Sequence, residues 1–167
     1  HIFNKTVIQR MISIVIDLIL LIILTELFCI LAKNPDIRAV FSMLHELEGM
    51  GGDAQSFADA YYAFLVQFMR IYQFFLKILI SYKGITMMLL RGKTIGMLVN
   101  GIALVSRKDE EYHIACLRYL GDALLTALLL YVFNSVLYIM SLFFIFRDDL
   151  HATGIERICG LKLIESR

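Results

Sequence analysis

The chain has 167 residues, of which 59% are hydrophobic, and its mean hydropathy is +0.74. Soluble domains are about 45–50% apolar, so this composition indicates a membrane protein. The formal net charge is only +1, and no basic run alternates with aromatic residues, which argues against nucleic-acid binding. The cysteines at 29, 116 and 159 lie far apart without metal-ligand spacing, so neither a disulfide framework nor a zinc site is predicted.

The first predicted membrane helix covers residues 7–31, where nearly every residue from Met11 to Leu31 is apolar. At about 1.5 Å per residue, it is long enough for a hydrocarbon core of roughly 30 Å. Arg10 and Asp17 are seven residues apart, close to two turns, so they share one face. Ionisable groups inside a bilayer usually have a partner and a function. We therefore select both as functional charges; the alternative is that Arg10 snorkels to the headgroups and Asp17 is a satisfied packing residue.

A short amphipathic helix is predicted outside the membrane at residues 35–48. Asn34 suits the N-cap and Pro35 the first helical position, while glycines at 49, 51 and 52 end the helix. Its apolar residues recur on one face, at Ile37, Val40, Phe41 and Leu44. Such a face packs on other helices, rests on the bilayer surface or binds a partner, and packing is the commonest outcome.

A second membrane helix is predicted at residues 57–90, and its polar residues indicate one wet face. Asp59, Arg70 and Lys77 fall within a narrow arc at a rotation of roughly 100° per residue. Either this face packs toward neighbouring helices, with the cytoplasmic end of the helix beyond the bilayer, or it brings Arg70 to Asp17 across a helix interface. Arg70 is included among the candidate functional charges for the second reason.

The third apolar segment, residues 117–146, allows two topologies. It is too short for two crossings of about 20 residues each, and on length we favour a single crossing. The alternative is a half-inserted hairpin that is broken near Asn134 and Ser135. At the start of the segment, Arg118 and Asp122 are four residues apart, and we expect them to form a local ion pair.

Two glycine-flanked runs favour the hairpin. GKTIGMLVNGIALVS at 92–106 and CGLKLIES at 159–166 are rich in β-branched residues and leucine, which suits short strands that pair with one another. This pairing requires the C-terminal tail to lie on the same side of the membrane as the 91–118 connection. The sequence therefore leaves this argument in conflict with the argument from length.

The distribution of charge predicts the orientation. Acidic residues outnumber basic ones in the 32–57 loop, whereas residues 77–111 carry six Lys and Arg side chains within or beside the predicted membrane ends: Lys77, Lys83, Arg91, Lys93, Arg107 and Lys108. By the positive-inside rule, the N-terminus and the 91–118 connection are cytoplasmic and the 32–57 loop is extracytoplasmic. The sequence thus predicts one all-α membrane domain over residues 1–167, a small helical bundle with short strand-like segments at its cytoplasmic face.

The motifs of soluble enzymes are missing from the sequence. RGKTIG resembles a phosphate-binding loop, but Met87 stands where the first glycine is needed. The histidines at 1, 45, 113 and 151 lack metal-ligand spacing. We therefore expect no enzymatic activity, no metal and no cofactor.

Several of these segments, taken in order, resemble the RDD family of small integral membrane proteins. RMISIVID carries Arg10 and Asp17, RGKTIGMLVNGIALVS resembles the family's glycine-rich segment, ACLRYL carries Arg118, and GIERICGLKLI resembles the family's closing motif. In that closing motif Glu156 replaces the family's last aspartate, and Ile155 replaces the preceding histidine. The resemblance adds five positions in the two glycine-containing motifs, namely Gly92, Thr94, Gly96, Gly101 and Gly160.

The resemblance implies a role in the transport of ions or small solutes, or in the assembly of a larger membrane complex. In the first case, the intramembrane pair of Arg10 and Asp17 couples charge to conformation, and the small number of spans requires a homo-oligomer or other membrane subunits beside the lipid bilayer. In the second case the same charges hold helices together. The two cases differ in whether the polar faces are buried against this chain's own helices or against another chain.

Overall fold

The computed structural model describes residues 4–33, 37–133, 136–147 and 151–166. Within these residues nearly all regular structure is helical, and the strands form a single two-stranded sheet. The predicted all-α fold class is therefore confirmed. Residues 1–21 and 76–167 form one compact unit, and residues 22–75 form another.

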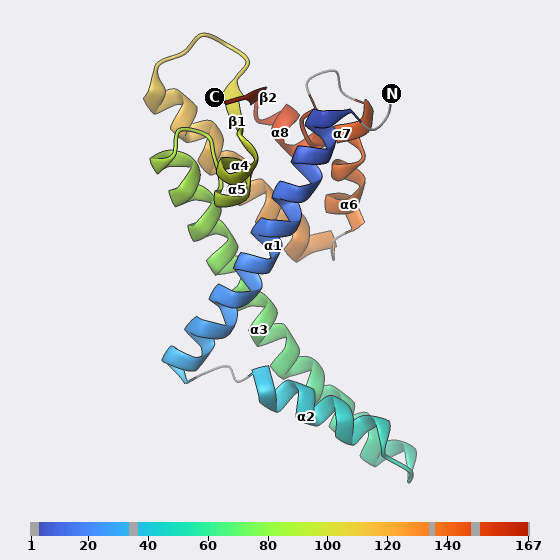
Figure 1. The fold of residues 1–167 in the computed structure, drawn as a ribbon. Coiled ribbons are helices and arrows are strands. Elements are labelled where there is room, and N and C mark those ends of the chain that lie inside the picture. Colours follow the sequence, from blue (N-terminus) through green and yellow to red (C-terminus); the bar gives the residue numbers. More distant parts are fainter. Residues whose placement is uncertain (1–3, 34–36, 134–135, 148–150, 167) are drawn as a thin grey trace. The chain divides into compact units, whose positions relative to one another are not determined.

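Three of the described helices are long and apolar enough to cross a membrane: α1 (Lys5–Ala32), α3 (Ala54–Leu89) and α5 (Tyr112–Phe133) (Figure 1). The first two agree with the spans predicted at residues 7–31 and 57–90. Three such helices fit a multi-pass membrane protein.

The predicted external helix is α2 (Ile37–Glu48). Its expected cap residues, Asn34 and Pro35, lie outside the described residues. Within its apolar stripe, Val40 is buried, whereas Phe41 is 68% exposed. Packing therefore covers only part of the stripe.

In the unit formed by residues 1–21 and 76–167, a small sheet lies beside one end of α5. The strands β1 (Ile102–Ser106) and β2 (Leu161–Glu165) pair in antiparallel fashion, with Ser106 opposite Leu161. Their inward-facing residues share a core with α3, α4 (Ile95–Asn100) and α5, which contains Met87, Met97, Ile102, Leu104, Ala115, Tyr119, Leu161 and Leu163. The strand pairing predicted from the two glycine-flanked runs is confirmed.

The course of the described residues after α5 favours the hairpin over the single crossing of the third apolar segment. After α5 the chain continues through α6 (Val136–Leu142), α7 (Phe144–Arg147) and α8 (Gly154–Ile158), and both α6 and α8 pack against α5. β2 then pairs with β1, which precedes α5, so the chain returns to the end where α5 began (Figure 1). Length alone treats residues 117–146 as one span, whereas the described residues divide this segment into α5 and the shorter helices of residues 136–147. The expected break near Asn134 and Ser135 lies outside the described residues.

Candidate functional site

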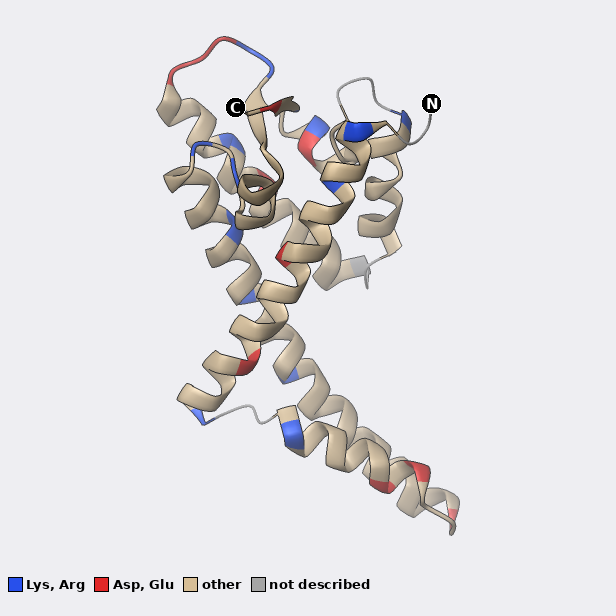
Figure 2. Ribbon diagram, in the orientation of Figure 1, with Lys and Arg blue, Asp and Glu red and all other residues tan. Residues whose placement is uncertain are grey.

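Charged residues occur well inside the long helices and not only at their ends, as Figure 2 shows for α1 and α3. The first of them, Arg10 on α1, is 3% exposed and donates a hydrogen bond from Nη2 to Oε1 of Glu156, which is fully buried. The two residues are 146 positions apart in the chain. This buried ion pair joins the first membrane helix to the C-terminal α8.

Glu156 also orders the start of α8. Its Oε2 accepts a hydrogen bond from the backbone N–H of Thr153 at 2.9 Å, and its own N–H donates to Oγ1 of Thr153 at 3.2 Å. This reciprocal arrangement is a capping box. One carboxylate therefore caps a five-residue helix and neutralises a buried guanidinium at the same time.

A second buried ion pair joins α3 to α5. Lys83 Nζ lies 2.7 Å from Oδ2 of Asp122 and 3.4 Å from Oγ1 of Thr126, whose hydroxyl donates to the backbone carbonyl of Asp122. Asp122 is fully buried, and its other oxygen, Oδ1, has no hydrogen-bond donor among the described residues. A buried carboxylate oxygen without a donor is costly. The Nε of Arg10 is likewise buried without an acceptor among the described residues.

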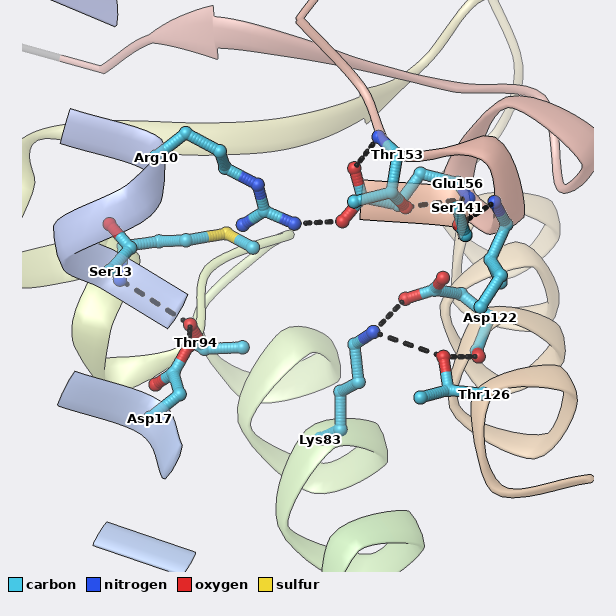
Figure 3. A network of polar contacts seen from close by, with 12 residues as sticks. Arg10, Ser13, Asp17, Lys83, Thr94, Asp122, Thr126, Ser141, Thr153 and Glu156 are labelled. Carbon is cyan, nitrogen blue, oxygen red and sulfur yellow. Dashed lines mark hydrogen bonds and ion pairs between the residues drawn. The ribbon is translucent and has the colours of Figure 1, made fainter. Parts of the chain in front are cut away.

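The two ion pairs form one electrically neutral group, which we call the charge cluster: Arg10, Lys83, Asp122 and Glu156. Figure 3 shows Arg10 and Glu156 pointing toward each other, with Lys83 pointing toward Asp122 and Thr126. Its two positive and two negative charges cancel, as burial in a low dielectric requires. The cluster therefore depends on four separate helices: α1, α3, α5 and α8.

Asp17 lies on α1 outside this cluster, where it anchors α4. Its Oδ1 accepts from the backbone N–H of Gly96 at 2.9 Å and from the Tyr82 hydroxyl at 2.6 Å, and its Oδ2 accepts from the Thr94 hydroxyl. The predicted pairing of Arg10 with Asp17 is wrong, because each has different partners. With three donors, Asp17 fits the alternative of a satisfied packing residue.

Gly96 makes this anchoring possible. A Cβ added at Gly96 would lie 2.3 Å from the backbone oxygen of Ser13, so only glycine lets α4 approach α1 so closely. The other motif positions also lie at bends and close contacts. Thr94 is the N-cap of α4, and the three glycines with positive φ are Gly92, Gly101 and Gly160.

Arg118 does not pair with Asp122, and the predicted local ion pair is wrong. Its guanidinium instead binds both carboxylate oxygens of Glu110, from Nε at 2.8 Å and from Nη2 at 2.6 Å, and donates from Nη1 to the carbonyl of Cys159 at 2.9 Å. Glu110 offers Arg118 two parallel hydrogen bonds. Asp122 forms its ion pair with Lys83 instead. Arg118 thus ties the β1–α5 connection to Cys159, the residue that caps the C-terminus of α8.

The pKa of Glu110 is lowered to about 2, chiefly by its hydrogen bonds with Arg118. A carboxyl group with a lowered pKa stabilises the fold above its unfolded value of 4.5, and this stabilisation is lost as pH falls from there through about 2. We expect Glu110→Gln to lower the melting temperature in detergent at neutral pH. The difference from the wild type should shrink as the pH is lowered, whereas Asp109→Asn, at an exposed neighbour, should have little effect throughout. A pH-independent difference would contradict this prediction.

Comparison with protein-family models, curated proteins and solved structures finds no match to this chain.

Two further residues complete the account of the predicted charges. Arg70 belongs to the unit of residues 22–75, where its side chain is exposed, and its predicted approach to Asp17 stays a prediction. From the sequence, Lys83 is selected only among the basic residues that indicate orientation. Its position inside the apolar 57–90 segment is the same signal that singled out Arg10 and Asp17, so the sequence did contain a reason to select it.

Proposed function

We propose that the protein takes part in the transport of ions or small solutes across a membrane, without enzymatic activity, as an oligomer or as a subunit of a larger complex. The resemblance of its motifs to the RDD family supports this proposal. The orientation that accompanies it has a cytoplasmic N-terminus and 91–118 connection and an extracytoplasmic 32–57 loop. The pairing of β2 with β1 supports a C-terminal tail on the same side as the 91–118 connection.

The observation that carries the proposal is the state of Asp122. This carboxylate is fully buried on α5, one of the candidate membrane helices, and its Oδ1 has no donor among the described residues. A carboxylate of this kind has a free acceptor for a proton or a cation. It replaces Asp17 as the coupling residue, because both carboxylate oxygens of Asp17 already accept hydrogen bonds.

Protonation of Asp122 would change the balance of the charge cluster. A neutral Asp122 no longer compensates the ammonium group of Lys83, and removing one partner of a buried ion pair costs about 3–5 kcal/mol. A free energy of this size is enough to shift the population between two arrangements of α3 and α5. Charge state is in this way coupled to conformation, as transport requires.

A second candidate function is that of a structural or assembly subunit. It is favoured by Arg10, Asp17 and Glu156, which form hydrogen bonds within this chain that hold α1, α4 and α8 together. In this case Asp122 never needs to change its charge, and the buried pairs serve only packing.

Reconstitution of the purified protein in liposomes separates the two functions. We expect the wild type to dissipate a sodium or potassium gradient in a pH-dependent way, detected with an entrapped pH-sensitive dye. The double variant Lys83→Met with Asp122→Asn removes both charges together, so it avoids a lone buried ion and should fold while losing this flux. Lys5→Gln, which changes an exposed lysine at the start of α1, serves as the control and should keep the flux. Flux that persists in the double variant would rule out Asp122 as the coupling residue, and absence of flux in the wild type would favour the assembly role.

A further inference from the structure

The outer face of α3 carries polar side chains that this chain leaves uncovered. Arg70, Gln73 and Lys77 are exposed, and within the described part of the chain their side chains form no hydrogen bond or ion pair. Their spacing of three and four residues places them on one side of the helix. Because α3 is a candidate membrane helix, such a face in contact with lipid tails is unfavourable, and a partner or the headgroup region must satisfy it.

An uncovered carboxylate of the opposite charge lies on α1. Glu26 is exposed and has no ion-pair partner among the described residues, and it stands in the most apolar helix of the chain. Its neighbours on the same face are more than half exposed isoleucines, at Ile22, Ile23 and Ile30. The chain therefore presents both halves of an ion pair without joining them.

Helix geometry explains why one copy does not join them. Glu26 follows Asp17 by nine residues on α1, and Gln73 precedes Tyr82 by nine residues on α3. Nine residues turn the helix by about two and a half turns, so Glu26 and Gln73 face away from the sides of their helices that carry the hydrogen bond between Asp17 and Tyr82. The two uncovered faces are thus directed outward.

The nine-residue separation also places the two uncovered faces at matching positions along α1 and α3. Nine residues rise about 13 Å, and consecutive membrane helices run in opposite directions, so Glu26 corresponds in depth to Gln73. Arg70 and Lys77 lie about one turn on either side of Gln73, within the reach of their long side chains. Two copies related by an axis along the membrane normal keep these depths.

We propose that this protein binds a second copy of itself through an intermolecular ion pair between Glu26 on α1 of one copy and Arg70 on α3 of the other. The inference rests on the oligomeric form of the proposed function and is independent of what is transported. The exposed isoleucines around Glu26 pack against the second copy, and Lys77 supplies a second cation beside the pair. Arginine suits this contact because it binds a carboxylate through two parallel hydrogen bonds.

Cross-linking in membranes tests the contact directly. In a background without the three native cysteines, one tagged copy carries Ile30→Cys, one turn from Glu26, and a differently tagged copy carries Gln73→Cys, one turn from Arg70, so both charges of the proposed pair are kept. A short bismaleimide is added to membranes that contain both copies, and we expect a cross-linked product with both tags. Ile30→Cys with Leu128→Cys, which lies on α5 and is similarly exposed, should give none. Equal yields from the two mixtures would overturn the proposal.

Native mass spectrometry in mild detergent provides the second measurement, which does not depend on flux. The wild type should be oligomeric, Glu26→Gln and Arg70→Gln should each become largely monomeric, and the charge reversal Glu26→Arg with Arg70→Glu should restore the oligomer. A monomeric wild type with bound lipid would show that these residues meet headgroups, and a wild type bound to a different protein would identify another occupant. Either result, or an oligomer unaffected by both single variants, would overturn the proposal, whereas a missing flux in an intact oligomer would count only against transport.

Discussion

Glu156→Gln is expected to lower the free energy of unfolding by about 3–5 kcal/mol, because it leaves the buried guanidinium of Arg10 without a counter-charge. Both side chains are almost completely buried, so solvent does not screen the loss. Glu156→Asp keeps the charge and should be milder. The measurement is unfolding in mixed micelles by titration with a denaturing detergent, together with the folded yield.

A double-variant cycle distinguishes the ion pair from general disruption of α8. Arg10→Met with Glu156→Gln should recover part of the loss, through an interaction energy of about 0.5–3 kcal/mol. The matched control is Glu165→Gln, at an exposed carboxylate on β2, where a change of about 0–1 kcal/mol is expected. Equal effects of the variants at 156 and 165 would show that the Arg10–Glu156 pair does not stabilise the fold.

Sequence reasoning succeeds where a local pattern determines the outcome. The length and apolarity of α1 and α3 predict their extents within a few residues, since a hydrocarbon core sets the length of a spanning helix. The glycine-flanked runs predict β1 and β2, and their pairing decides the course of the third segment. Length alone favours a single crossing because it cannot show that residues 117–146 divide into α5 and the shorter α6 and α7.

The sequence does not predict which of the charged residues pair with one another. Opposite charges four residues apart on a helix attract one another, and this rule predicts a pair of Arg118 with Asp122. Arg118 instead pairs with Glu110, before the start of α5, and Asp122 pairs with Lys83 on α3. Arg10 and Glu156 were both selected, one from its place in an apolar helix and the other from a resembling motif. Nothing in a single sequence fixes the rotation of helices about their axes, and this rotation decides which charges meet.

Gly96→Ala is expected to have the other large effect, because the new Cβ would lie 2.3 Å from the backbone oxygen of Ser13 and 2.9 Å from Oδ1 of Asp17. A backbone atom cannot move aside as a flexible side chain does, so α4 must withdraw from α1. Withdrawal breaks the hydrogen bonds that Gly96 and Thr94 donate to Asp17. Overpacking costs about 1–3 kcal/mol, and each lost hydrogen bond to a charged group adds about 1.5–3 kcal/mol. The free energy of unfolding should therefore fall by more than about 3 kcal/mol.

Gly84→Ala is the matched control, since Gly84 is also buried in a helix but its added Cβ would lie 3.8 Å from Leu120, at ordinary contact distance. Alanine is the better helix former by about 0.5–1 kcal/mol, so this variant should be neutral or slightly more stable in the same unfolding titration. A second readout follows α4 itself: Leu98→Cys, at an exposed position, should change its rate of maleimide modification in the Gly96→Ala background but not in the Gly84→Ala background. If both alanine variants unfold at the same detergent fraction as the wild type, the close approach of α4 to α1 does not hold Asp17 in place. Asp17 would then again be a candidate for the coupling residue.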